Sequence, residues 1–217
     1  MLKRFFFSLL VIAILGIGSA ACAAPKAHKE SKVEYFGLKP LDGGRQYIHL
    51  KDHIGPNAPQ ENKLLVLGFF ASWCKPCKKE IPQIQALYEK YKSQGLQVLF
   101  VNIDKEKPEI EKARKFIKKS KVTFPVLSDH YNLVARRYFD EEFNLPATFV
   151  VDSNGIIQKV FTGNGKDSQD ELETEIRKQL KLPIEQKTNK ITAKQNKPKP
   201  KINTKKKNTH KRAKKNK

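Results

Sequence analysis

Two cysteines stand where an apolar run gives way to a segment with the pattern of an amphipathic helix. The run Leu64–Phe70 is continuously apolar, and Cys74 and Cys77 follow it at the start of the helical pattern. This spacing puts both sulfurs in the first helical turn, where the helix dipole and unpaired amide N–H groups stabilise a thiolate on Cys74. Pro76 fits that turn because its missing N–H would have no helical partner there. Such a dithiol is suited to thiol–disulfide exchange, in which Cys74 attacks a substrate disulfide and Cys77 resolves the mixed disulfide.

The same cysteine spacing also occurs in half of a zinc site, which would need two further ligands. His49 and His53 have the i, i+4 spacing of a ligand pair, but the glycines and the proline on either side of them argue against a helix that presents both to a metal. An inert buried pair of cysteines is a second alternative. We expect a redox dithiol that uses no cofactor and holds no metal.

Most of the net charge of +21 belongs to the C-terminal tail. Residues 187–217 carry fourteen Lys or Arg and no Asp or Glu, whereas residues 26–186 have a net charge of only +5. A segment so poor in apolar residues cannot bury enough surface to order itself, so we expect a disordered Lys-rich tail over 184–217. It lacks the aromatic residues of a single-strand binder, which makes nucleic acid an unlikely partner. The tail either serves solubility or binds anionic lipid or cell-wall polymer.

The N-terminus has the anatomy of an export segment, which we place at residues 1–22. A short basic start precedes an apolar run over 5–17 and then a series of small residues. Cys22 follows those small residues and resembles the acylated cysteine of bacterial lipoproteins, although Ser19 stands where that pattern has Leu. Cleavage by ordinary signal peptidase and an uncleaved anchor remain alternatives. In each case the domain is exported, and its redox chemistry takes place outside the cytoplasm, in the periplasm or at the outer face of a bacterial membrane.

Residues 23–32 have no apolar period and are expected to form a spacer, and residues 33–183 then predict one α/β domain. Continuous apolar runs at 64–70 and 97–104 are typical of central strands that are covered on both faces. The turn signal Ser153-Asn154-Gly155 predicts a hairpin between 147–152 and 156–161. Helices are expected after Cys74, around 110–117, over 133–139 and around 172–180, with short strands at 122–127 and between 33 and 63. This order predicts a sandwich with a central mixed β-sheet flanked by helices.

Two separated motifs resemble one known family. The run 69–82, Phe-Phe-Ala-Ser-Trp-Cys-Lys-Pro-Cys-Lys-Lys-Glu-Ile-Pro, is similar to the active-site segment of TlpA/ResA-type proteins, which are extracytoplasmic thioredoxin-like thiol–disulfide oxidoreductases of the AhpC/TSA–redoxin superfamily. The run 144–155, Asn-Leu-Pro-Ala-Thr-Phe-Val-Val-Asp-Ser-Asn-Gly, resembles their second signature, a cis-proline that enters a strand and hairpin. The resemblance covers roughly residues 33–183 and implies a thioredoxin-like fold.

By position, the resemblance makes Cys74 the nucleophile and Cys77 the resolving cysteine. It makes Pro146 the cis-proline that lies against the dithiol and leaves the preceding backbone free to pair with an extended substrate. The residues expected at the substrate cleft are Trp73, Lys75, Pro76, Leu145 and Pro146. Asn144 stands where many members of the family have Gly, and Leu145 stands before the proline where a β-branched residue is commoner. Both positions touch the substrate cleft.

Glu80 matches an acid that ResA-type proteins place near the dithiol. It follows Cys77 by three residues and therefore shares its helical face. A carboxyl group partly buried beside two thiols would have a raised pKa and could transfer protons. The alternative is a solvated carboxylate on the helix surface, since Lys78 and Lys79 show that this helix has a wet side nearby.

The sequence thus predicts a cell-envelope thiol–disulfide oxidoreductase, most simply a disulfide reductase that acts on disulfide-bearing proteins. A membrane electron donor of the thiol–disulfide type would keep it reduced, and the resemblance implies cytochrome c maturation as one outlet. One alternative is a peroxiredoxin-like peroxidase, although Ala71 stands where peroxidatic sites have Thr or Ser. Another alternative is a tethered binding module that uses the basic tail on anionic polymer or lipid.

Overall fold

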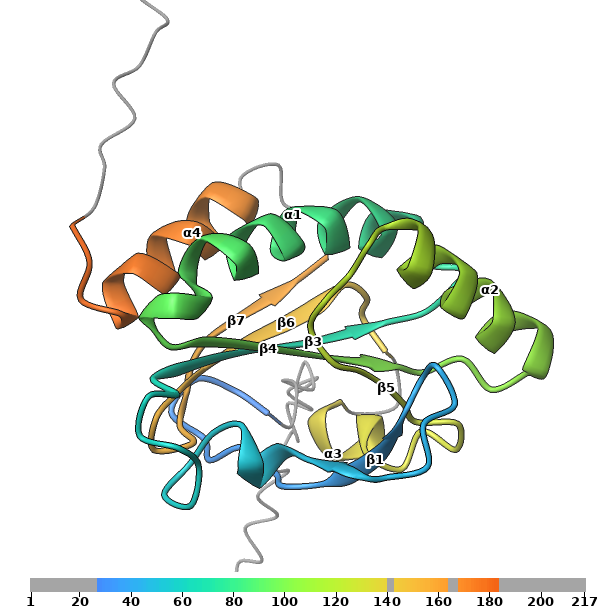
Figure 1. The fold of residues 1–217 in the computed structure, drawn as a ribbon, viewed down its shortest axis with the longest axis horizontal. Helices are drawn as coiled ribbons and strands as arrows, with labels where there is room; N and C mark the ends of the chain where they lie inside the picture. The colour runs from blue at the N-terminus through green and yellow to red at the C-terminus, as the bar shows by residue number, and fades with distance from the viewer. Residues whose placement is uncertain (1–26, 140–142, 164–167, 184–217) are drawn as a thin grey trace, which may run out of the picture. The chain divides into compact units, whose positions relative to one another are not determined.

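The computed structural model describes residues 27–139, 143–163 and 168–183, which form a seven-stranded mixed sheet with helices on both faces (Figure 1). The predicted export segment 1–22 with Cys22, and the predicted Lys-rich tail 184–217, lie outside the described residues. The sheet order is β2-β1-β5-β4-β3-β6-β7. The strands are β1 Gly37–Pro40, β2 Ile48–His49, β3 Leu64–Phe70, β4 Leu96–Asn102, β5 Val126–Ser128, β6 Ala147–Asp152 and β7 Ile157–Thr162. The helices are α1 Lys75–Tyr91, α2 Lys107–Lys119, α3 Ala135–Tyr138 and α4 Ser168–Gln179, with 3-10 turns at Leu50–Asp52 and Lys92–Gln94.

The centre of the sheet is the pair of parallel strands β3 and β4, which confirms the two predicted central strands. Every residue of β3 is buried, and its neighbour on the other side, β6, runs antiparallel to it. Gly68 in β3 faces the ring of Phe100 in β4, and a Cβ at that position would lie only 2.2 Å from the ring. Only glycine at this position therefore lets β3 and β4 pair while the ring of Phe100 packs over it.

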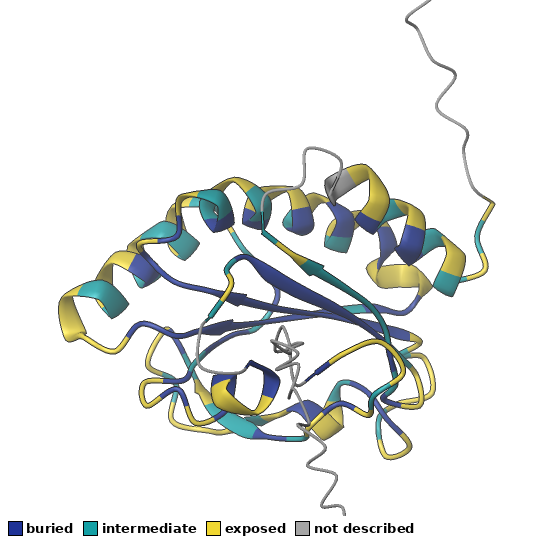
Figure 2. Cartoon of the chain, turned by 180° about the vertical axis from the view of Figure 1, so that it is seen from behind, coloured by how far each residue is buried: buried dark blue, intermediate teal, exposed yellow. Residues whose placement is uncertain are grey.

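Helices α1, α2 and α4 cover one face of the sheet, and α3 lies on the other (Figure 1). The helix side of the core includes Ile81, Ile84 and Leu87 of α1 with Leu172 and Ile176 of α4, all of them buried. Figure 2 shows the same division, because the central strands and the helix faces turned toward them are dark blue while the outer helix faces are mostly yellow. The predicted sandwich with a mixed sheet flanked by helices is confirmed.

An aromatic cluster fills the core on the α3 side of the sheet. The ring centroid of Phe69 lies 5.1 Å from that of Tyr138, 5.1 Å from that of Phe139 and 5.9 Å from that of Phe149. The hydroxyl of Tyr138 donates a hydrogen bond of 2.7 Å to the carbonyl of Glu34. This bond satisfies the one polar atom that Tyr138 brings into the core.

The ordered packing begins earlier than residue 33, inside the stretch predicted as a spacer. The backbone N–H of Glu30 donates to the carbonyl of Ile157 at 2.7 Å, and the N–H of Ile157 donates to the carbonyl of Ser31 at 2.9 Å. Ala27 is buried in the core. The second half of the segment 23–32 is therefore part of the folded domain.

Two of the predicted elements are shorter in the structure. The helix predicted over 133–139 is reduced to α3: the carboxylate of Asp129 accepts the backbone N–H groups of Leu133, Val134 and Ala135 at 2.7–3.0 Å, as a cap does at a helix start, and Phe139 is already extended. The strand predicted over 122–127 begins only at Val126, since the N–H of Thr123 donates to the side chain of Gln85 on α1 instead of to a strand. The predicted hairpin between β6 and β7 is present. Among the described residues, no helix combines the length and the apolar character that a membrane span requires.

Candidate active site

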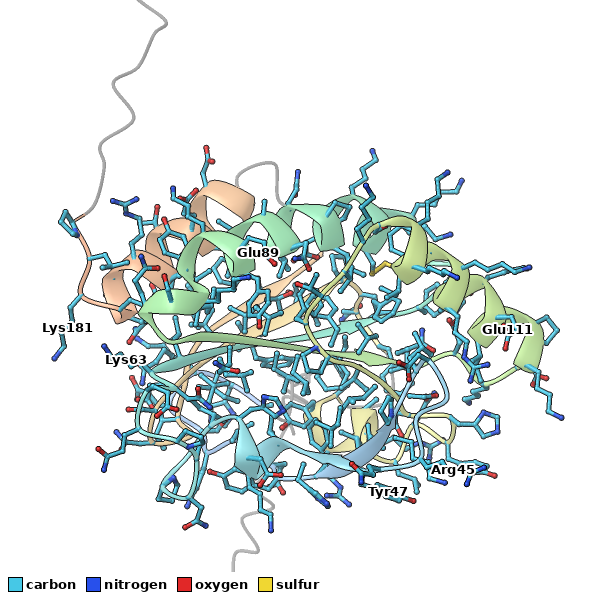
Figure 3. All side chains as sticks on the ribbon, viewed as in Figure 1. Arg45, Tyr47, Lys63, Glu89, Glu111 and Lys181 are labelled. Carbon is cyan, nitrogen blue, oxygen red and sulfur yellow. A yellow bond between two sulfur atoms is a disulfide. The ribbon has the colours of Figure 1, made fainter. Side chains whose placement is uncertain are left out.

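The two cysteines lie where β3 passes into α1, and they are joined in a disulfide (Figure 3). Cys74 is the N-cap residue of α1, and its Sγ accepts a hydrogen bond of 3.2 Å from the backbone N–H of Cys77. Pro76 occupies the first turn, as predicted. Both cysteines are buried, with exposed fractions of 4% for Cys74 and 1% for Cys77. An amide N–H directed at Sγ of Cys74 is the arrangement that stabilises a thiolate on that atom.

The residues predicted for the substrate cleft gather at the carboxyl end of β3. Trp73 is 57% exposed, and Lys75 is exposed beside it. The Leu145–Pro146 peptide bond is cis, as the resemblance implied. In the register of β3 and β6, Phe69 pairs with Ala147, so Leu145 and Pro146 enter the sheet at the same edge as the dithiol loop. Pro146 is buried and Leu145 is half-buried.

Glu80 points from α1 toward β6 instead of into solvent. Its Oε1 accepts a hydrogen bond of 3.0 Å from the hydroxyl of Thr148, which is itself buried. Burial raises the pKa of the Glu80 carboxyl, and the hydrogen bond from Thr148 offsets part of that rise. The Glu80 carboxyl therefore keeps its proton to a higher pH than a fully solvated glutamate does.

A second carboxylate, Asp104, holds the loop that carries the cysteines. Asp104 is buried just after β4, and its two oxygens accept from the backbone N–H of Ser72 at 3.1 and 2.8 Å. The hydroxyl of Ser72 and the side-chain amide of Asn102 also donate to it, at 3.2 and 2.8 Å. These bonds fix the backbone two residues before Cys74.

Sequence reasoning missed both Asp104 and Thr148. An acidic residue that directly ends an apolar strand of the central sheet is a usable signal for Asp104, because the carboxyl ends of the parallel strands β3 and β4 meet at one edge. Nothing in the sequence pairs Thr148 with Glu80, since 68 residues separate them.

The two histidines weighed as zinc ligands lie on separate elements. His49 is an exposed residue of β2 and stacks on Tyr47, with ring centroids 6.3 Å apart. His53 follows the first 3-10 turn, and burial lowers the pKa of its imidazole, while a hydrogen bond with Gln97 raises it in part. Within the ranges that the structure describes, no three His, Cys, Asp or Glu side chains gather where they could hold a metal ion.

Comparisons with known proteins agree on one group of relatives. Residues 31–160 match the AhpC/TSA family. The ResA thiol-disulfide oxidoreductase of Bacillus subtilis is 33% identical over 173 residues, which are 76% of this chain and 89% of that protein. The ResA of Geobacillus kaustophilus is 36% identical over 114 residues, and this match spans 52% of the chain and 63% of the relative, less than two thirds of its length.

A solved structure matches the fold. The crystal structure of a protein from Chlorobium tepidum assigned as a thiol:disulfide interchange protein DsbE is 28% identical and superposes with a TM-score of 0.60. The match covers 71% of this chain and 99% of that one. The predicted thioredoxin-like fold and the predicted resemblance are therefore confirmed, and the relatives carry the names of the enzyme class that the sequence predicts.

Proposed function

The chain belongs to the AhpC/TSA family, and from this and the geometry of its dithiol we propose that it is a disulfide reductase of the cell envelope. The observation that carries the proposal is the position of Cys74 at the N-cap of α1, with the amide N–H of Cys77 directed at its sulfur. Only a sulfur at that position meets both the helix dipole and an amide donor.

In the proposed reaction the reduced protein transfers two electrons to a substrate disulfide. The Cys74 thiolate attacks one substrate sulfur, which forms a mixed disulfide and releases the other substrate sulfur as a thiolate. Cys77 then loses its proton and attacks Sγ of Cys74, which closes the protein disulfide and releases the second substrate thiol. A membrane donor of the thiol–disulfide type reduces the Cys74–Cys77 disulfide again.

The proposed substrate is a disulfide-bearing protein that enters as an extended segment. The substrate cleft consists of Trp73, Lys75, Pro76, Leu145 and Pro146. The exposed indole of Trp73 offers an apolar platform, and the backbone before Pro146 offers hydrogen-bonding groups for a strand-like segment. Apocytochrome c, whose thiols must be reduced before haem attachment, is the client class that the family resemblance implies.

The proposed location is the outer side of a bacterial cytoplasmic membrane or the periplasm. Residues 1–22 would direct export, and acylation of Cys22 would anchor the chain to the membrane. The Lys-rich tail 184–217 would bind anionic lipid or cell-wall polymer. A pull-down of each at increasing salt, with and without residues 187–217, tests the tail, because an electrostatic contact weakens as salt screens it.

The reduction potential tests the direction of electron flow. We expect a reducing value, near ~−270 mV and far from the oxidising end of the range at ~−120 mV. The expectation follows from the resemblance to ResA-type proteins, with Lys75 and Pro76 between the cysteines and no histidine there to stabilise the thiolate further. Equilibration with glutathione measures the potential. A value at the oxidising end would make the protein an oxidase and end the reductase proposal.

Glu80 is the proposed proton donor and acceptor for the thiols. Because burial raises its pKa, the carboxyl keeps its proton to a higher pH than an ordinary glutamate and can give it to a departing sulfur. As pH rises through that raised pKa, the Glu80 carboxyl loses its proton and can no longer act as the acid. In the Glu80→Gln variant the amide cannot ionise, so we expect the rate of disulfide exchange to fall by at least about tenfold below the raised pKa and the corresponding inflection to disappear. Stopped-flow measurement of the rate against pH checks this.

The control for this prediction is Glu61→Gln, which removes an exposed carboxylate outside the site. Stability gives a second readout with a definite sign. A carboxyl whose pKa is raised by folding stabilises the fold below its unfolded pKa and loses that contribution as pH rises through the raised value. Glu80→Gln should therefore be at least as stable as the wild type at neutral pH. If its pH–rate curve overlays that of the wild type, Glu80 has no role in proton transfer.

A further inference from the structure

One groove collects most of the large apolar side chains that the described surface exposes. Among the described residues, four large hydrophobic side chains are exposed, and one of them, Trp73, belongs to the dithiol loop. The other three all line a groove of about 700 Å³ between β1, α2 and α3: Tyr47 with an exposed fraction of 57%, Tyr131 with 72% and Leu133 with 63%. Exposed apolar side chains gathered in one concave site are a mark of recognition.

The same groove is strongly basic. The cations that line it are Lys39, Arg45, Lys107, Arg114 and Arg137. The acid among its described lining residues is Asp129, whose carboxylate is already occupied by three backbone N–H groups at the start of α3. Arg114 is paired with Glu111. Lys39, Arg45 and Lys107 are exposed and form no ion pair within the described ranges, and Lys39 lies 5.5 Å from the centre of the Tyr47 ring. The groove therefore offers uncompensated positive charge beside aromatic surface.

Part of the lining of the groove comes from the carboxyl edge of the sheet, the edge that also carries the dithiol. Lys107 begins α2 after the carboxyl end of β4, and Asp129 to Tyr131 follow the carboxyl end of β5. Cys74 follows the carboxyl end of β3, and these three strands run parallel. In Figure 3, Arg45 and Tyr47 lie below the sheet, on the side of β1, whereas the disulfide lies above it beside α1, and Lys63 and Lys181 lie at the left end of the domain.

We propose that this groove docks an acidic, aromatic-containing polypeptide segment of the protein whose disulfide is reduced. The cations of the groove would bind carboxylates, and its three apolar side chains would pack against aromatic or aliphatic side chains. An anionic sugar–phosphate polymer has no such apolar side chains. The inference rests on the proposed function only in assigning the segment to a disulfide substrate.

The test measures binding of a short, fluorescein-labelled, cysteine-free peptide of Glu, Asp, Tyr and Gly to the oxidised full-length protein by fluorescence anisotropy. The variant Lys39→Gln/Arg45→Gln removes two groove cations, and Lys63→Gln/Lys181→Gln removes two exposed cations at the left end of the domain in Figure 3. The basic tail is present in both variants and contributes equally to both. Each exposed charge contact changes affinity by roughly twofold, so we expect the groove variant to bind about fourfold more weakly and the control to bind like the wild type.

Two further arms identify the ligand and separate this inference from the catalytic one. A peptide with Gln and Asn in place of the acids should bind equally to all three proteins, and vesicles containing anionic lipid should not distinguish the groove variant from the control. The docking proposal would be overturned if the groove variant and the control lost the same affinity for the acidic peptide. It would also be overturned if the groove variant lost affinity for the vesicles and not for the peptide. Because the peptide has no cysteine, its binding does not depend on catalysis, whereas reduction of a neutral disulfide peptide by the wild type tests the proposed activity alone.

Discussion

Replacement of Cys74 by serine should abolish disulfide exchange, with a loss of turnover of about a thousandfold or more. A serine hydroxyl stays protonated at neutral pH, so the N-cap position and the amide of Cys77 have no thiolate to stabilise. Cys77→Ser should instead keep the first attack and lose the second, so that a covalent mixed disulfide with the substrate accumulates. The rate at which substrate thiols are released measures the loss of turnover, and mass spectrometry of the mixture without added reductant detects the mixed disulfide.

The third cysteine of the chain supplies the control. Cys22→Ser replaces a cysteine that lies outside the proposed reaction, and the purified variant should keep wild-type turnover. In this background, alkylation of the reduced protein at mildly acidic pH should label Cys74 before Cys77, because the residue at the helix mouth has the lower thiol pKa. Earlier labelling of Cys77, or trapping of substrate by Cys74→Ser, would reverse the two roles.

Phe69→Ala should lower the free energy of unfolding by about 3–5 kcal/mol, the cost of removing a large buried aromatic side chain and leaving a cavity. Phe69 is 1% exposed, and its ring meets those of Tyr138, Phe139 and Phe149. This cluster joins β3 to α3 and β6, so no single neighbour can move to fill the space. Chemical denaturation of the oxidised protein, followed by far-UV circular dichroism, measures the change.

Tyr131→Ala is the matched control, since it removes an aromatic ring that is 72% exposed. The free energy of unfolding should then change by no more than about 0.5 kcal/mol. A loss below about 1 kcal/mol for Phe69→Ala would mean that the aromatic cluster collapses into the gap, and the account of the core on the α3 side would be wrong.

The elements predicted most accurately are those whose signals are local. The bounds of β3 and β6 agree with the sequence prediction because each is an apolar run with turn residues on both sides. The position of Cys74 at a helix start could be predicted for the same reason, since the cysteine spacing, Pro76 and the following apolar period all lie within one short segment.

The features that the sequence could not predict depend on contacts between distant residues. The helix expected over 133–139 ends at Tyr138, because Phe139 is extended and its ring packs against Phe69 of β3, seventy residues earlier in the chain. The direction of Glu80 depends on Thr148, and the support of the dithiol loop depends on Asp104. The sequence pattern of one segment does not show which residue of another segment will contact it.

Because the folded domain begins before Val33, residues 30–32 lie beside the edge strand β7 of the sheet. β7 is its last strand, and an uncovered last strand offers a row of backbone groups to which another copy of the chain could add. Here Glu30 and Ser31 occupy both the carbonyl and the N–H of Ile157, and Lys32 bridges Ile156. Residues 30–32 thus cover the start of β7 against pairing with a second copy of the chain, and a chain shortened to begin at Val33 would lose this cover.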